Sequence, residues 1–111
     1  MPKKMLLFLL MASFTLGGCM SKAQQYYAAG DHAAMIREFD VREGHRMLKS
    51  FDLYYLCPSF LALRNYQKSL ACADELERRD RREMNANGQI ITPEIMKVQA
   101  YLIKLQTYLD T

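Results

Sequence analysis

Hydrophobic residues form one long run at the start of the chain and recur at helical spacing near its end. The run covers residues 5–16 almost without interruption. The later apolar residues lie three or four positions apart, at Ile95, Val98, Leu102, Leu105 and Leu109. Because this spacing places side chains on one side of an α-helix, it predicts a helix from Pro93 onward, capped by Thr92, with one buried stripe.

The region between these two segments also has a helical composition. After residue 18 it contains few glycines and prolines and many Ala, Leu, Met, Lys, Arg and Gln residues, which favour helices. Capping residues and breakers predict helices over about 31–43, 46–63 and 66–84, and a loop over 85–88. Pro58 lies inside the second of these helices and predicts a kink or a break near Cys57. Residues 89–92 are too short a run to carry a sheet.

Two stretches of the chain match each other at a fixed offset of 34 residues. Residues 23–36 align with residues 57–70. The matched positions are Tyr26 with Phe60, Tyr27 with Leu61, Gly30-Asp31 with Arg64-Asn65, and Ile36 with Leu70. A period of 34 residues is that of the tetratricopeptide repeat, in which each unit is a pair of antiparallel helices.

The second stretch also resembles the consensus of that repeat family. The matching residues are Leu53, Leu56, Cys57 and Phe60 in the first helix, Arg64-Asn65-Tyr66 in the turn, and Ser69 and Ala73 in the second helix. The resemblance covers residues 21–84 and implies an all-α fold. It would consist of antiparallel helical hairpins of a short tetratricopeptide-like solenoid, with about four helices in a repeat domain over residues 26–111. A generic helical bundle with accidental spacing is the alternative.

In that repeat family, partners bind the concave face formed by the first helix of each hairpin. The resemblance therefore implies a binding face made of Tyr27 in the first hairpin and of Phe51, Tyr54 and Leu61 in the second. The alternative is that the last helix, or a further repeat, covers these side chains and makes them core. That helix is expected either to cap the array or to begin a third hairpin in a truncated relative of a longer array.

The apolar run at the start of the chain is typical of an export signal. Lys3 and Lys4 precede it, and about a dozen residues are too few for a transmembrane helix, which needs roughly 20. The run ends in Leu16-Gly17-Gly18-Cys19, which resembles the lipobox of bacterial lipoproteins. The resemblance implies a signal peptide over residues 1–18, diacylglycerol on the Cys19 thiol and a short tether over residues 19–25. Met20, in place of aspartate, resembles the pattern for export to the outer membrane. An ordinary secreted protein with a coincidental cysteine is the alternative.

Charge and cysteine content add two constraints. The formal net charge of the whole chain is +3, but the two signal lysines contribute most of it, so nothing indicates a nucleic-acid partner. Cys57 and Cys72 are the thiols that remain once Cys19 is lipidated. Outside the cytosol paired cysteines tend to form disulfides, but cysteine is also an ordinary buried residue, so the sequence leaves this bridge open.

The sequence contains no recognisable motif for catalysis, metal binding or phosphate binding. His32 and His45 lack the ligand spacing of a zinc site, and the charged run over residues 75–83 suits a solvated helix end. We therefore expect no cofactor and no enzymatic activity. The expected function is that of an outer-membrane-anchored periplasmic lipoprotein that binds an envelope protein or peptide through its repeats. The alternatives are a structural accessory subunit that dimerises or completes a larger assembly, and an enzyme of cell-wall metabolism.

Overall fold

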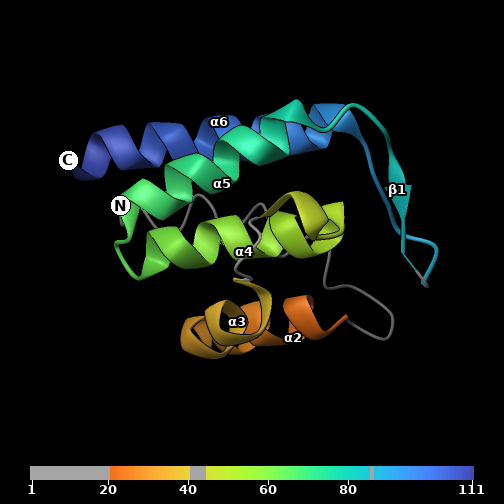
Figure 1. The fold of residues 1–111 in the computed structure, drawn as a ribbon, viewed down its shortest axis with the longest axis horizontal. Helices are drawn as coiled ribbons and strands as arrows, with labels where there is room; N and C mark the ends of the chain where they lie inside the picture. Colours follow the sequence, from red (N-terminus) through yellow and green to blue (C-terminus); the bar gives the residue numbers. More distant parts are fainter. Residues whose placement is uncertain (1–20, 41–44, 86) are drawn as a thin grey trace.

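The fold is built from helices arranged around one central helix. The computed structural model describes residues 21–40, 45–85 and 87–111, so the predicted signal peptide and Cys19 lie outside the described residues. The elements are α2 (Lys22–Ala29), α3 (His32–Phe39), the 3₁₀ turn η1 (His45–Met47), α4 (Ser50–Ala62), α5 (Tyr66–Arg78), β1 (Glu83–Met84), β2 (Ile90–Ile91) and α6 (Pro93–Asp110). Figure 1 shows α2 and α3 on one side of α4, with α5 and α6 on the other. The all-α class is therefore confirmed, apart from a two-stranded ladder.

Two helical hairpins have equivalent turns at the predicted offset. Gly30 joins α2 to α3 with φ 72°, and Arg64 joins α4 to α5 with φ 61°. Asp31 N donates to Tyr26 O, and Asn65 N donates to Phe60 O, each at 2.9 Å. Both turns also end in a helix-capping side chain: Asp31 accepts from Ala34 N at 3.2 Å and Asn65 from Lys68 N at 3.3 Å. The 34-residue match thus corresponds to two hairpins with the same turn geometry.

The first helix begins earlier than predicted. Ser21 and Gln24 form a capping box, in which Gln24 N donates to Ser21 Oγ at 3.3 Å and Ser21 N to Gln24 Oε1 at 3.0 Å. The expectation of a tether through residue 25 is therefore wrong, because residues from Lys22 onward already belong to α2.

The start of α4 is fixed by residues that follow it by about thirty positions. Its N-cap, Lys49, makes no side-chain capping bond. The Glu83 carboxylate accepts instead from Ser50 N at 3.0 Å and from Phe51 N at 3.1 Å. Arg79 holds the preceding turn by donating to Leu48 O at 2.8 Å. The predicted helix over 46–63 is consequently divided into η1 and α4.

Pro58 does not break α4. A regular helix would satisfy the Tyr54 carbonyl with the N–H of residue 58, which proline lacks. In its place Gln99 of α6 donates through Nε2 to Tyr54 O at 3.3 Å. The helix runs from Ser50 to Ala62 without interruption, so of the kink or break expected near Cys57, the break is wrong.

A short β-hairpin replaces the predicted end of the third helix. The helix α5 ends at Arg78, and β1 pairs with β2 in antiparallel register, Glu83 with Ile91 and Met84 with Ile90. In the connecting turn, Asn85 Oδ1 accepts from Asn87 N at 3.0 Å and from Gln89 N at 2.9 Å. Two residues per strand give no alternating pattern that a sequence could reveal.

The helix α6 starts as predicted but buries a different side. Thr92 accepts from Ile95 N at 3.2 Å, and Pro93 occupies the first turn. The fully buried side consists of Met96, Gln99, Ala100, Ile103, Gln106 and Thr107. Val98 and Leu109 of the predicted stripe are 50% and 53% exposed. The expectation of one buried stripe is therefore wrong, because α6 has apolar residues on two sides.

Candidate functional site

The binding face implied by the repeat resemblance is mostly interior. Phe51, Tyr54 and Leu61 are 4%, 1% and 4% exposed. Tyr27 is half-buried, its ring centroid lies 6.0 Å from that of Tyr55, and burial raises the pKa of its hydroxyl to about 12. The expected face is therefore wrong as an exposed surface. The physical reason is that α4 is enclosed by α2, α3, α5 and α6.

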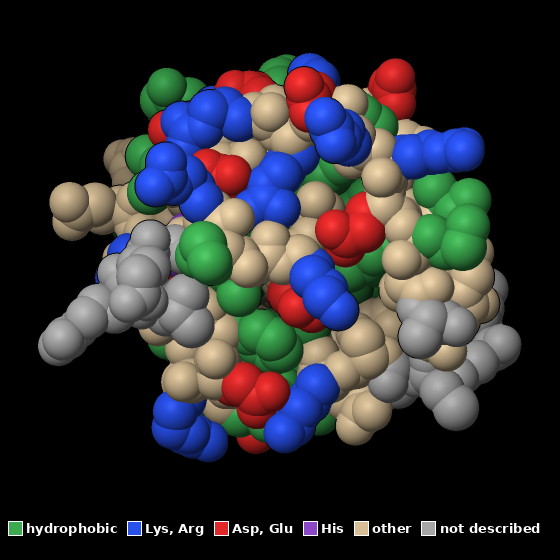
Figure 2. Space-filling model, turned by 45° about the vertical axis from the view of Figure 1, so that its right-hand side comes forward, with side chains coloured by type: hydrophobic (Ala, Val, Ile, Leu, Met, Phe, Trp, Pro, Cys, Tyr) green, Lys and Arg blue, Asp and Glu red, His purple; other side chains and the backbone are tan. Residues whose placement is uncertain are grey.

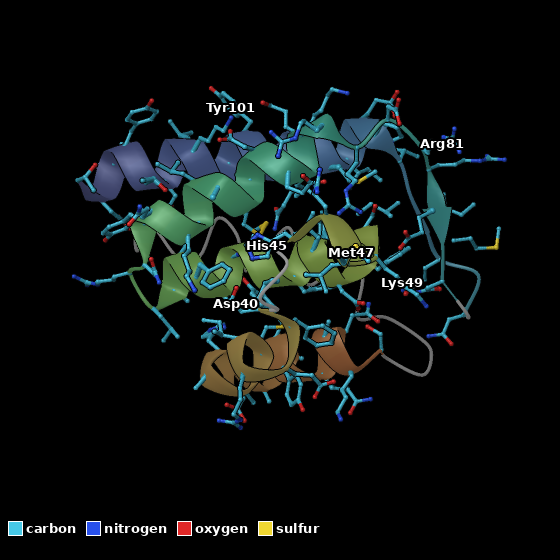
Figure 3. The ribbon with its side chains drawn as sticks, viewed as in Figure 1. Asp40, His45, Met47, Lys49, Arg81 and Tyr101 are labelled. Carbon is cyan, nitrogen blue, oxygen red and sulfur yellow. A yellow bond between two sulfur atoms is a disulfide. The ribbon has the colours of Figure 1, made fainter. Side chains whose placement is uncertain are left out.

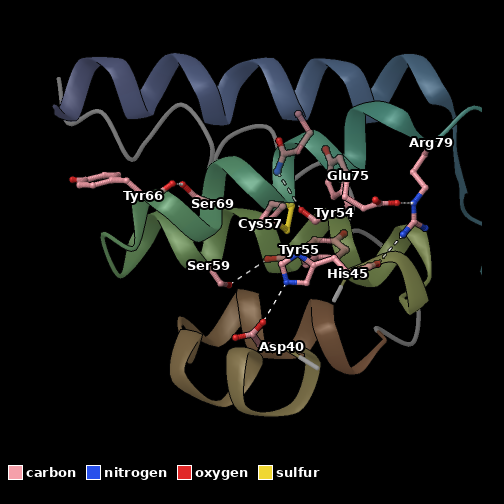
Figure 4. The surroundings of a disulfide bond; sticks show 12 residues. Asp40, His45, Tyr54, Tyr55, Cys57, Ser59, Tyr66, Ser69, Glu75 and Arg79 are labelled. Carbon is pink, nitrogen blue, oxygen red and sulfur yellow. Dashed lines mark hydrogen bonds and ion pairs between the residues drawn. A yellow bond between two sulfur atoms is a disulfide. The ribbon is translucent and has the colours of Figure 1, made fainter. Parts of the chain in front are cut away.

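The two cysteines that the sequence left open are joined. Cys57 of α4 and Cys72 of α5 form a disulfide with a Cα–Cα distance of 5.3 Å (Figure 4). Both residues are completely buried. The bond links the two helices of the second hairpin across their packed interface.

A serine and a histidine that the sequence did not connect are neighbours in the structure. Nδ1 of His32 lies 3.0 Å from Ser59 Oγ. Ser59 is completely buried and donates its hydroxyl hydrogen to Tyr55 O at 3.2 Å. The pair therefore links α3 to the buried side of α4.

A second polar cluster consists of Asp40, His45 and Lys68. Lys68 Nζ lies 2.6 Å from Asp40 Oδ2, and His45 Nε2 lies 3.3 Å from Asp40 Oδ1. The ring centroid of Phe60 lies 5.7 Å from that of His45 and 5.6 Å from Lys68 Nζ. Figures 3 and 4 show Asp40 and His45 directed toward each other. The described residues contain no group of three or more His, Cys, Asp or Glu side chains that could hold a metal ion.

The charged run over residues 75–83 forms fewer helical pairs than its spacing predicts. Glu75 pairs with Arg78 at 2.9 Å and with Arg79 at 3.0 Å. Burial raises the pKa of Glu75, but hydrogen bonds from these two arginines outweigh it and the net shift is downward. Glu77 pairs with Lys104 of α6 at 3.2 Å, and Arg81, four positions after Glu77, lies beyond the end of α5 at Arg78.

An exposed apolar surface runs along α6, and we call it the α6 face. Its most exposed members are Val98 (50%), Tyr101 (62%), Tyr108 (78%) and Leu109 (53%). At 3.6 residues per turn, these side chains are centred roughly 170° around the helix from the buried side. Figure 3 shows Tyr101 at the outer edge of α6. The sequence has apolar residues both on the buried side of α6 and on the α6 face. Only the packing of α6 against α5 and α4 shows which of the two is buried.

Comparison with known proteins gave no relationship. No protein-family model, curated protein or solved structure matches the chain. Among the described helices, none combines the length and hydropathy needed to span a membrane.

Proposed function

We propose that this chain is a lipoprotein anchored through Cys19 at the periplasmic face of the bacterial outer membrane. Its folded part would act as a protein-binding module of tetratricopeptide-like hairpins. The observation that carries the anchor is Leu16-Gly17-Gly18-Cys19, which directly follows a short apolar run. Acyl chains contribute about 0.8 kcal/mol per buried CH₂, so the two or three chains of a lipoprotein give stable attachment.

The disulfide supports the proposed compartment. Disulfides form and persist in oxidising compartments such as the periplasm and are rare in the cytosol. The pair Cys57–Cys72 is buried between two helices. A chain exported as its first residues indicate would meet the conditions in which this bond forms.

The α6 face is the surface we propose for partner binding. The two equivalent helical turns support a repeat architecture, but three of the four residues expected to bind are core. Large aromatic side chains that remain exposed, Tyr101 and Tyr108, have the chemistry that dominates protein interfaces. The partner we propose is an envelope protein or peptide that presents an apolar surface.

A second candidate function is a structural subunit that pairs through the same face. Ile95, Val98, Leu102, Leu105 and Leu109 follow the alternating three-and-four spacing of a coiled-coil seam. Of the side chains that flank this seam, Gln99 and Gln106 are buried, and the exposed Tyr101 carries no charge that would repel a second copy. This spacing favours a helix as the partner element.

The anchor is tested by fractionating cells that express the full chain and its Cys19→Ser variant. The wild-type chain should incorporate labelled fatty acid and sediment with outer membranes, whereas Cys19→Ser should do neither. A Met20→Asp variant serves as a control that keeps the acceptor thiol, and it should stay lipidated but move to the inner membrane. Absence of label from the wild-type chain would refute the anchor.

The binding surface is tested by placing a photo-cross-linking amino acid at Tyr101 in living cells. Arg37, which is exposed on α3, on the other side of α4 from α6, is the control position. A cross-linked product at position 101 and not at 37 supports the α6 face. A product of twice the chain mass favours self-association, and any other mass indicates a different envelope protein. Equal cross-linking at both positions would rule out this face.

A further inference from the structure

The β-hairpin lies beside the first turn of α2. Gln24 Nε2 donates to Tyr55 Oη at 2.9 Å and to Gln89 Oε1 at 3.4 Å. Gln89 belongs to the turn between β1 and β2, and Asn85 Nδ2 also donates to its Oε1, at 2.7 Å. Figure 1 shows β1 and the start of α2 at the same end of the molecule. The turn of the β-hairpin is thus fixed next to the point where the described chain begins.

The chain between this point and Cys19 is very short. Only Met20 separates Cys19 from Ser21, the N-cap of α2. An extended chain spans at most about 3.6 Å per residue, so the Cα atoms of Cys19 and Ser21 lie within about 7 Å of each other. Lipid on Cys19 would therefore hold this end of the molecule against the bilayer.

The β-hairpin presents apolar side chains at that end. The cross-strand pair Met84 and Ile90 is 64% and 39% exposed. The neighbouring pair has the opposite orientation, because Ile91 is completely buried and the Glu83 carboxylate binds the first amides of α4. Met47, which is 77% exposed, is labelled on the same side of the molecule in Figure 3.

Basic and acidic residues both lie next to the β-hairpin. Arg81 and Arg82 directly precede β1, are exposed, and make no ion pair with another described residue. Among the acids, Glu83 is occupied by α4, whereas Asp80 is exposed. Figure 2, which turns this side toward the viewer, shows basic, acidic and hydrophobic side chains interleaved. Arg81 is labelled beside β1, at this end of the molecule, in Figure 3.

We propose that the β-hairpin rests on the bilayer that holds Cys19. Met84 and Ile90 enter the interfacial region, and Arg81 and Arg82 contact anionic headgroups. The inference rests on the proposed function, because the lipid on Cys19 supplies the attachment. What it adds is the orientation of the domain: apolar side chains are stabilised by leaving water, and basic side chains are attracted to an anionic surface. The helix α6 starts directly after β2, so its last turn, with Tyr108 and Leu109, lies far from the bilayer.

The test places an environment-sensitive dye on the full, processed chain through Met84→Cys. Cys57 and Cys72 are already bonded and buried, and the unsubstituted chain measures any labelling of Cys19. Tyr108→Cys is the matched control, because Tyr108 is also exposed but lies at the opposite end of α6. The proteins are reconstituted into vesicles of phosphatidylethanolamine and phosphatidylglycerol, and association is measured separately by flotation.

We expect the dye at position 84 to emit at shorter wavelength and to be quenched several-fold more by spin-labelled lipid than the dye at position 108. Reversing the charges in Arg81→Glu plus Arg82→Glu should reduce that difference while flotation is retained. A dye at Ile90→Cys provides a second reporter if Met84→Cys folds poorly. If the chains float with the vesicles but the dyes at positions 84 and 108 both report an aqueous environment, the inference is overturned and the anchor stands. Chains that do not float would overturn the anchor and the inference together.

Discussion

Two residues hold left-handed backbone conformations at equivalent places in the two helical hairpins. Gly30 has φ 72° and Arg64 has φ 61°. Glycine adopts this region without a steric penalty, whereas a residue with a Cβ atom loses roughly 1–2 kcal/mol there. The first hairpin therefore has the better residue at its turn, and the second hairpin carries a strained one.

Arg64→Gly should stabilise the protein, and Gly30→Ala should destabilise it, each by about 1 kcal/mol. Both changes are measured by urea unfolding followed by circular dichroism. Leu63→Gly is the control, because Leu63 has φ −89° and gains nothing from glycine. A loss of stability in Arg64→Gly equal to that of the control would show that the turn is not strained.

Buried tyrosines make stability depend on pH in alkaline solution. Burial raises the pKa of Tyr27 and of Tyr55 to about 12, although a hydrogen bond from Gln24 partly opposes the shift at Tyr55. Burial also raises the pKa of Tyr54. In the unfolded chain these hydroxyls ionise near pH 10, so the unfolded state loses protons first.

The free energy of unfolding should therefore be unaffected by these groups below about pH 10 and fall as the pH rises toward about 12. Denaturant unfolding at a series of pH values, together with the ultraviolet absorbance of tyrosinate, measures this. Tyr27→Phe removes one of the groups and should flatten the slope. Stability that stays constant across this range would mean that the hydroxyls are not buried.

At the scale of elements, the central helix depends on a side chain from α6. Pro58 removes the backbone donor that Tyr54 O would otherwise bind, and Gln99 Nε2 donates to that oxygen at 3.3 Å. Leaving a buried carbonyl without a donor costs about 1–3 kcal/mol. The proline in α4 and the glutamine in α6 should therefore be energetically coupled.

Gln99→Leu should destabilise the protein by about 1–3 kcal/mol. The same substitution should cost less in a Pro58→Ala background, because alanine restores the helical N–H. Chemical unfolding of the two single variants and the double variant gives the coupling energy. Additive effects would show that Gln99 does not compensate for the proline.

Capping and turn residues in the sequence predicted the element boundaries that depend only on nearby residues. Thr92-Pro93 begins α6 as expected, and the turn at Gly30 lies where the repeat places it. The start of α4 could not be predicted, since Glu83 supplies its cap from more than thirty residues away. The buried side of α6 could not be predicted either, because the helix carries apolar residues on two of its sides. Tyr54 was assigned to an exposed face because nothing in a single sequence shows that α4 is enclosed on every side.

At the scale of the whole molecule, the disulfide fixes one hairpin against which the other elements pack. Cys57 and Cys72 are separated by 15 positions. Closing a loop of this length stabilises a folded chain by about 3 kcal/mol in the chain-entropy model. The helix α4, which carries Cys57, contacts α2, α3 and α6 as well as α5.

The double variant Cys57→Ala with Cys72→Ala should therefore lower the free energy of unfolding by about 3 kcal/mol. Comparison of wild type with and without reductant in the same unfolding assay provides the control. Free thiols on the exported, non-reduced wild-type chain would contradict the bond.

In the proposed function, lipid attached to Cys19 would decide where the protein lies and which end of it faces the membrane. Mass spectrometry of the amino-terminal peptide, taken from chain recovered from membranes, measures this attachment most directly. The expected peptide begins at Cys19 and carries the mass of diacylglycerol on its thiol. A peptide that begins at another residue, or that begins at Cys19 with an unmodified thiol, would contradict the proposed anchor and the orientation built on it.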